Sequence, residues 1–239
     1  MDMPERLRRT FNMYSRTGEH RARVEEALKV IDEALSWHER RYVAYSGGKD
    51  SICLLHLVLS RGDADIWHWD HGPYLMPRQV ELELQAIGRR ILAESGRRGV
   101  FIIETSRRLN TVKARWEYMR WYRSFYGRLR QYIEKYGWTL GFLGLRAEES
   151  PRRARRLRNR FFKHTGLITE CYPLARWTWM DVWAYIVSHG LPYPSFYDRY
   201  AKVLGYDKTR LVTFFDREFS HLGAENIDNI LMWRERNKK

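Results

Sequence analysis

The chain has 239 residues, 44% of them hydrophobic, which is enough to bury a substantial core in one large domain. Its 43 Lys and Arg against 29 Asp and Glu give a formal net charge of +14, which favours anionic partners such as nucleotides, sulfated nucleotides or nucleic acid, although arginine-rich surfaces also suit heat adaptation. No stretch approaches the ~18 uninterrupted apolar residues of a membrane helix, and residues 1–20 are too charged for a signal peptide, so we expect a cytoplasmic protein.

Helical and extended segments alternate along the first part of the chain. Residues 19–39 carry apolar side chains at three- and four-residue spacing, which predicts a helix. Four apolar, β-rich stretches follow, and helical periodicity lies between them. The stretches are residues 41–45, 65–69, 99–104 and 138–145, and the helical segments are residues 51–62, 77–95 and 111–137. This alternation predicts an α/β fold with a doubly wound, mostly parallel sheet and helices on both faces, in which ligands bind outside the carboxyl ends of the strands.

The pattern changes after residue 145. Residues 146–164 are polar and basic, and residues 166–179 look extended. The pattern predicts a short helix at residues 180–190 and a final amphipathic helix at residues 223–239. We therefore expect an N-terminal helical segment (1–40), a nucleotide-binding core (41–145) and a C-terminal elaboration (146–239) packed on the same domain.

A short polar turn joins the first predicted strand to the next helix. It consists of Ser46, Gly47, Gly48, Lys49, Asp50 and Ser51. Glycine tolerates positive φ and lets an anion approach without meeting a Cβ atom. Successive backbone N–H groups and the helix N-terminus then form a phosphate site, which the Lys49 ammonium and two serine hydroxyls would reinforce. The turn is not the G-x-x-x-x-G-K-[ST] loop, because its glycines are adjacent and Asp50 follows the lysine.

The run S-G-G-K-D-S after a strand resembles the PP-loop of the adenine nucleotide α-hydrolase superfamily, the ATP pyrophosphatases. The resemblance implies that ATP binds through its β- and γ-phosphates and is attacked at the α-phosphate, with release of pyrophosphate. Lys49 and the loop amides would stabilise the developing charge, together with Mg²⁺. Asp50 has two interpretations of equal weight: a ligand of Mg²⁺, or a residue that stabilises the first turn of the helix.

The second predicted strand ends in D-H-G, residues 70–72, at the edge where adenosine would lie. The Asp70 carboxylate could accept hydrogen bonds from ribose hydroxyls, and an exposed His71 imidazole could contact the base or a phosphate. The run is also similar to the corresponding segment of tRNA-modifying members such as lysidine synthetases. The alternative is a turn with an Asp cap and an incidental histidine.

Residues 143–156, L-G-L-R-A-E-E-S-P-R-R-A-R-R, resemble an element of the phosphoadenylyl-sulfate (PAPS) reductase family. That family also contains the small subunit of ATP sulfurylase and the ATPase-like subunit of DNA phosphorothioation systems. The matching residues are Gly144, Arg146, Glu148, Ser150 and Arg153. The resemblance implies that Arg146 binds phosphate or sulfate with help from Arg152 and Arg153, and that Glu148 orients Arg146.

Residues 172–199 resemble a further element of the same family, P-L-x-x-W-x-x-x-D-V-W-x-Y-I followed by L-P-Y and a Tyr-Asp pair. The pair falls on Tyr197 and Asp198. Trp183, Ile186 and Val187 are also expected to form a buried helix face, so most of this element has a structural interpretation. The three elements together cover about residues 41–200.

The sequence departs from sulfonucleotide reductases of that family in two ways. The loop at residues 46–51 is an intact ATP-type loop, and no cysteine follows Cys171 to serve as the thiol nucleophile. Cys53 and Cys171 lie far apart without a C-x-x-C motif, so we expect buried thiols and no disulfide, zinc or iron–sulfur site. The resemblance therefore favours an ATP-dependent adenylyl transfer enzyme in sulfur metabolism or sulfur transfer, and the alternative is a PAPS or adenylyl-sulfate reductase that uses a partner's thiol.

Residues 152–163 hold six arginines and one lysine beside two phenylalanines, which suggests a third function, a nucleic-acid-binding subunit of a tRNA or DNA thiolation system. A solvated basic face is the structural alternative. A regulatory module that binds ATP without turnover also stays open. ATP sulfurylase small subunits work with a GTPase partner, so the resemblance leaves room for a protein partner and for an oligomer.

Overall fold

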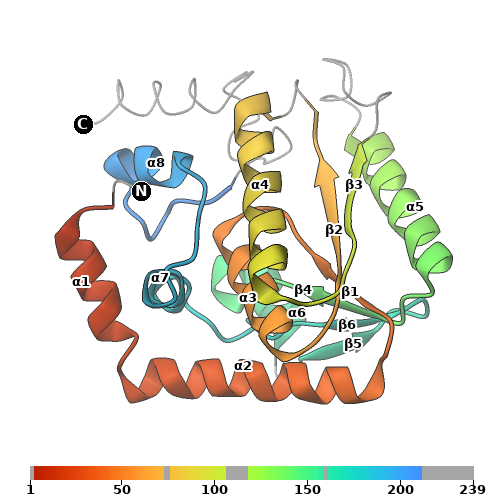
Figure 1. The fold of residues 1–239 in the computed structure, drawn as a ribbon, viewed down its shortest axis with the longest axis horizontal. Coiled ribbons are helices and arrows are strands. Elements are labelled where there is room, and N and C mark those ends of the chain that lie inside the picture. The colour runs from red at the N-terminus through yellow and green to blue at the C-terminus, as the bar shows by residue number, and fades with distance from the viewer. Residues whose placement is uncertain (1–2, 73–75, 106–117, 159–160, 212–239) are drawn as a thin grey trace.

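The computed structural model describes residues 3–72, 76–105, 118–158 and 161–211, and the tail helix expected at residues 223–239 lies outside them. Its strands are β1 (Arg41–Ala44), β2 (Asp65–Asp70), β3 (Phe101–Thr105), β4 (Leu140–Leu143), β5 (Phe162–His164) and β6 (Thr169–Cys171). Within the described residues they form one sheet in the order β3-β2-β1-β4-β6-β5, parallel except for β5 (Figure 1). The predicted α/β sheet is confirmed.

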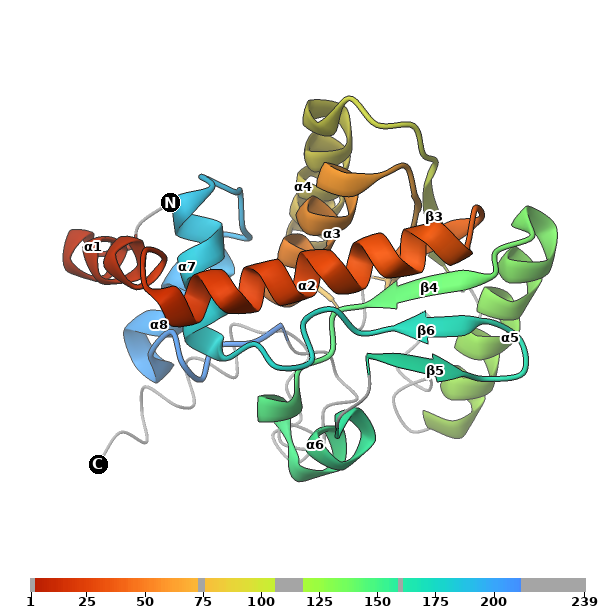
Figure 2. The ribbon, with the colours of Figure 1, turned by 90° about the horizontal axis from the view of Figure 1, so that it is seen from below.

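Alternate side chains of the central strands bury opposite faces of this sheet. Val43 and Ile66 enter the core formed with α2 (Gly18–Trp37), α3 (Lys49–Arg61) and α4 (Arg78–Ser95). Tyr42 and Trp67 point the other way, into an aromatic cluster covered by α5 (Tyr118–Tyr136). Figure 2 shows α3 and α4 together on one side of the sheet. Both faces of the strands are buried, as parallel sheets require.

Three further helices pack beside this sheet: α1 (Glu5–Tyr14), α7 (Trp179–Ser188) and α8 (Phe196–Leu204). Their contact is aromatic, with the centroid of the Trp183 ring 6.3 Å from that of Phe11 and 5.4 Å from that of Tyr197. The helix expected at residues 180–190 is confirmed as α7, and Trp183 is fully buried as expected. The helix α1 lies within residues 1–40, where a helical segment was expected, whereas the sequence pattern did not predict α8.

The segment after β4 differs from the expectation. It forms a short 3₁₀ helix (Ala147–Glu149), then α6 (Pro151–Leu157) and the strands β5 and β6, which extend the sheet beyond β4. The extended prediction for residues 166–179 is wrong after Cys171, because the chain there makes tight turns, with Ala175 N–H bonded to Tyr172 O at 3.1 Å. Pro173 cannot donate to a strand ladder, so β6 stops before it.

Among the described residues, no helix combines the length and apolar character needed to cross a membrane.

Candidate functional site

The loop at residues 46–51, hereafter the phosphate loop, connects β1 to α3 at the carboxyl edge of the sheet. The sheet order places β2 on one side of β1 and β4 on the other, so the chain winds in opposite directions from this point. Open parallel sheets bind ligands at such a switch point. Three loops meet there: the phosphate loop after β1, residues 70–72 after β2, and residues 144–146 after β4.

Glycine is required in the phosphate loop for two reasons. Gly47 has a φ of +81°, and a Cβ atom on it would lie 2.6 Å from Leu84 Cβ of α4. The serines brace the loop internally, because Gly48 N–H donates to Ser46 Oγ at 3.3 Å and Ser51 Oγ donates to Gly48 O at 2.8 Å. The loop is therefore a preformed turn at the N-terminus of a 13-residue helix, whose positive end favours an anion.

Lys49 is the first residue of α3, and its side chain is covered by the chain itself. It is only 3% exposed, its Nζ donates to the carbonyl of Thr209 at 2.9 Å, and it lies 3.4 Å from Asp50 Oδ2. Its backbone N–H donates to the hydroxyl of Tyr197 at 3.0 Å. The lysine that sequence reasoning assigned to phosphate is thus placed in the loop, and residues after α7 enclose it.

Arg146 reaches the phosphate loop from the end of β4 and forms an ionic cluster there. Its Nε donates to Asp50 Oδ1 and its Nη1 to Glu148 Oε2. Burial alone would raise the pKa of Asp50, but Lys49 and Arg146 outweigh it and hold that pKa below its usual value. Asp50 is therefore ionised, and the site contains two cations facing two carboxylates.

The structure treats the other two predicted basic residues differently. Arg153 pairs with Glu149, which sequence reasoning did not assign and which also accepts a hydrogen bond from the N–H of Arg146 at 3.2 Å. Arg152 is exposed on α6. Lys49, Asp50, Arg146 and Glu148 are brought together, and Arg153 joins them only through Glu149.

Asp70 ends β2 beside the phosphate loop, with both carboxylate oxygens engaged. Oδ1 accepts from Gly72 N–H at 2.8 Å, and Oδ2 accepts from Arg78 and, at 3.4 Å, from Gln85. His71 is half-buried rather than exposed, and burial lowers its pKa to about 4, so the imidazole is neutral at pH 7. Asp70 thus lies in a polar network at the edge where adenosine was expected.

That network continues inward through a buried pair that the sequence did not reveal. His68 Nε2 lies 2.5 Å from Glu81 Oε1, and His68 Nδ1 lies 2.9 Å from the Tyr45 carbonyl, directly before the phosphate loop. A carbonyl only accepts, so Nδ1 is the donor to Tyr45 and Nε2 is the nitrogen that faces Glu81. The pair connects α4 to the entry of the loop.

Neither cysteine is placed to act as a nucleophile. Both are free and fully buried, and burial raises the pKa of each thiol. Among the described residues, no group of three or more His, Cys, Asp and Glu side chains is arranged to hold a metal ion.

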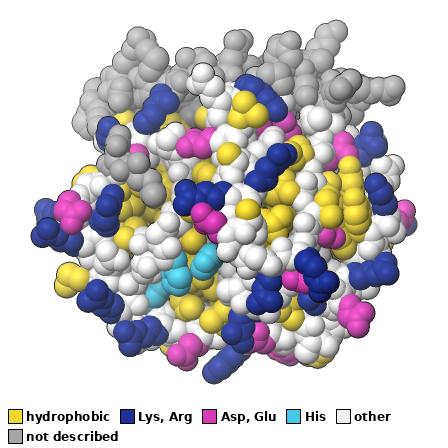
Figure 3. Space-filling model, in the orientation of Figure 1, with side chains coloured by type: hydrophobic (Ala, Val, Ile, Leu, Met, Phe, Trp, Pro, Cys, Tyr) yellow, Lys and Arg dark blue, Asp and Glu magenta, His cyan; other side chains and the backbone are white. Residues whose placement is uncertain are grey.

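The arginines of residues 152–163 only partly form an open basic face. Arg152, Arg155 and Arg158 are exposed, while Arg156 pairs with Glu170 at 2.7 Å. Arg160 lies outside the described residues. Figure 3 shows the face on the side of α4, where Lys and Arg side chains are spread among acidic ones, and α6 lies behind this face. The arrangement gives nucleic-acid binding no specific geometric support.

Comparisons with known proteins agree on one family. A model of the phosphoadenosine phosphosulfate reductase domain matches residues 40–225. Sulfate adenylyltransferase subunit 2 of Mycolicibacterium vanbaalenii is 27% identical over 209 residues, which cover 74% of this chain and 64% of that protein. Adenosine 5'-phosphosulfate reductase 2 of Bacillus subtilis is 39% identical over 69 residues, 29% of each chain. The chain therefore spans less than two thirds of the length of these curated relatives.

Among solved structures, phosphoadenylyl-sulfate reductase from Candida auris in a phosphate complex matches with a TM-score of 0.55 and 14% identity. The match covers 83% of this chain and 93% of that one. At this identity the likeness shows a shared fold.

Proposed function

Because the chain belongs to the phosphoadenosine phosphosulfate reductase domain family, we propose that it binds ATP at the phosphate loop and transfers the adenylyl group with release of pyrophosphate. The observation that carries this proposal is the loop itself, a glycine turn with a lysine at the N-terminus of α3 and Arg146 beside it. The relatives named sulfate adenylyltransferase subunit 2 support sulfate as the acceptor and a second protein subunit as partner.

The chemistry requires little beyond positioning and charge. An acceptor oxygen attacks the α-phosphorus, the bond from that phosphorus to the bridging oxygen breaks, and pyrophosphate leaves with the electron pair. Negative charge grows on the phosphate oxygens, and Lys49, Arg146 and the N-terminus of α3 are the groups that would stabilise it. In the present arrangement each cation faces a carboxylate of its own chain, so phosphate must compete with Asp50 and Glu148 for Arg146.

Mg²⁺ belongs to this proposal as a companion of ATP. It would be held mainly by phosphate oxygens and water, as is usual for nucleotide sites. Asp50 does not fit as its ligand in this arrangement, since Oδ1 is bound to Arg146 and Oδ2 lies 3.4 Å from Lys49 Nζ. We therefore assign Asp50 to the Arg146 pair and no catalytic step to an Asp50-bound metal.

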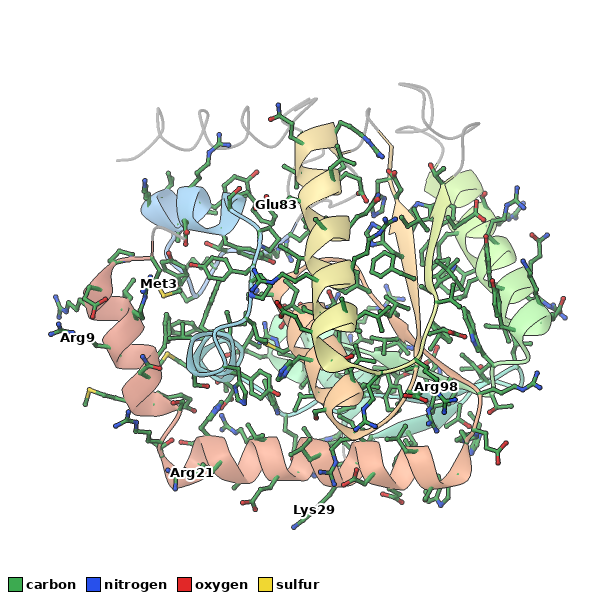
Figure 4. The ribbon with its side chains drawn as sticks, viewed as in Figure 1. Met3, Arg9, Arg21, Lys29, Glu83 and Arg98 are labelled. Carbon is green, nitrogen blue, oxygen red and sulfur yellow. The ribbon has the colours of Figure 1, made fainter. Side chains whose placement is uncertain are left out.

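The test is pyrophosphate release from MgATP with sulfate as acceptor, compared between wild type, Lys49→Met and Lys29→Met. Lys29 is an exposed lysine on α2, far from the loop along the lower edge of Figure 4, so it controls for the lost charge. We expect release that is lost in Lys49→Met and kept in Lys29→Met. Equal rates in all three proteins would contradict a role for the loop.

A sulfonucleotide reductase is the second candidate, favoured by the match to adenosine 5'-phosphosulfate reductase 2. Because both thiols are fully buried, such an enzyme would need a thiol from a partner. Adenosine 5'-phosphosulfate turnover that depends on an added thiol protein, without pyrophosphate release from ATP, would select it. The two unpaired cysteines support a reducing compartment, and we propose the cytoplasm.

A further inference from the structure

In this structure the Lys49 side chain, which would bind phosphate, is covered by the chain itself. Lys49 is 3% exposed, and Thr209, whose carbonyl accepts from its Nζ, is fully buried. The ammonium also lies 5.6 Å from the centroid of the Tyr197 ring. A phosphate can therefore reach Lys49 Nζ only if Thr209 moves away.

The backbone side of the loop is covered in the same way. A Cβ atom on Gly48 would lie 3.4 Å from Tyr197 Oη and 3.5 Å from Leu211 Cβ, so these two residues lie over the glycine at van der Waals distance from that position. The Tyr197 hydroxyl accepts a hydrogen bond from the N–H of Lys49 at 3.0 Å. Tyr197 and Leu211 thus bring α8 and the segment after it against the phosphate loop.

The segment after α8 is anchored at its start and contacts the phosphate loop further along. Gly205 ends α8 with a φ of +81°, and Tyr206 is anchored, because its hydroxyl donates to Asp198 at 2.7 Å and its carbonyl accepts from Trp183 Nε1 at 3.0 Å. Beyond this anchor, Thr209 is buried against Lys49 while its neighbours Lys208 and Arg210 are exposed. The start of α8 is itself held to α4, since Glu83 accepts from Ser195 N–H at 2.8 Å (Figure 4).

We propose that Tyr197 and residues 207–211 form a latch that occupies the phosphate-binding donors of Lys49, and that the triphosphate of the nucleotide displaces it. The proposal rests on the proposed function for its ligand. The Thr209 carbonyl and the Tyr197 hydroxyl are neutral acceptors, and phosphate oxygens form charge-assisted hydrogen bonds about twice as strong with the same donors. Binding of triphosphate and closure of the latch exclude each other, so weakening the latch increases affinity.

The first test compares Tyr197→Phe with Tyr193→Phe. Tyr193→Phe is the control, because it also removes one buried hydroxyl. That hydroxyl donates to Asp198 at 2.8 Å and does not contact the phosphate loop. Calorimetry measures the Kd for inorganic tripolyphosphate. We expect Tyr197→Phe to bind about fivefold more tightly than wild type, the value of one neutral hydrogen bond, and Tyr193→Phe to bind like wild type. Weaker or unchanged binding in Tyr197→Phe overturns the latch.

The second test uses the wild-type chain and needs no variant to fold. Trypsin cuts after lysine and arginine, so the exposed Lys208 and Arg210 report on the latch. Mass spectrometry of brief digests should show faster cleavage at these two positions when tripolyphosphate is bound. If calorimetry shows that tripolyphosphate binds but cleavage after Lys208 and Arg210 is unchanged or slower, the latch is overturned and the proposal that the loop binds a nucleotide still stands. No binding of either tripolyphosphate or ATP by the wild type overturns the latch and the proposed function together.

Discussion

The substitution Gly47→Ala measures how tightly the phosphate loop is built against α4. An alanine there must adopt a φ of +81°, which costs about 1 kcal/mol, and its Cβ would lie 2.6 Å from Leu84 Cβ and 2.9 Å from both Leu84 Cδ atoms. Leu84 Cβ is fixed to the helix backbone, so relief requires a shift of α4, and overpacking of this kind costs about 1–3 kcal/mol. We expect a total loss of about 2–4 kcal/mol in the free energy of unfolding.

Gly96→Ala is the matched control for the backbone term alone. Gly96 has a φ of +64° at the end of α4, and an added Cβ there would meet nothing within 4 Å. Urea unfolding of both variants gives the free energies, provided that the slope m stays unchanged. We expect Gly96→Ala to lose only about 1 kcal/mol. If the two variants were within about 0.5 kcal/mol of each other, the contact between Gly47 and Leu84 would not constrain the loop.

Three further outcomes follow from the buried ionisable groups. Arg146→Met should lower the free energy of unfolding in urea by about 3 kcal/mol, because the Asp50 carboxylate loses its arginine partner. The double variant with Asp50→Asn should regain part of this loss, and equal stability of the single and double variants would contradict the pairing. Asp181 has a pKa lowered to about 2, because hydrogen bonds to its carboxylate outweigh burial. As the pH falls from about 4 to 2, the free energy of unfolding of the wild type should therefore fall by about 2 kcal/mol more than that of Asp181→Asn. Parallel curves of unfolding free energy against pH for the two proteins would refute this. Cys53 and Cys171 should resist iodoacetamide in the native protein and react only after unfolding, as mass spectrometry can show.

Local patterns were sufficient for the strands β1 to β4 and for the position of the phosphate loop. Alternating strands and helices have periodicities that short segments carry by themselves, and a glycine pair with a lysine after a strand is a local signal. The spacing of apolar residues also predicted the buried face of α7. The helix α8 escaped prediction because its nine residues begin directly after a proline-rich turn and are too short for a clear period.

The contacts that define the site could not be read from the chain in the same way. Lys49 meets Tyr197 and Thr209 from 148 and 160 residues away, and Arg146 meets Asp50 from 96 residues away. Such pairings depend on how the loops after separate strands are brought to one edge of the sheet, and no periodicity records them.

The measurement that tests the central claim most directly is the identity of the nucleotide products formed from ATP labelled at the α-phosphate. The chain would be incubated with MgATP and sulfate, and the labelled products separated and identified. If the chain transfers the adenylyl group, the label appears in AMP or in an adenylylated acceptor, in equal amount to pyrophosphate, and it is absent with Lys49→Met. Label in ADP with release of orthophosphate would show attack at the γ-phosphate and contradict the account.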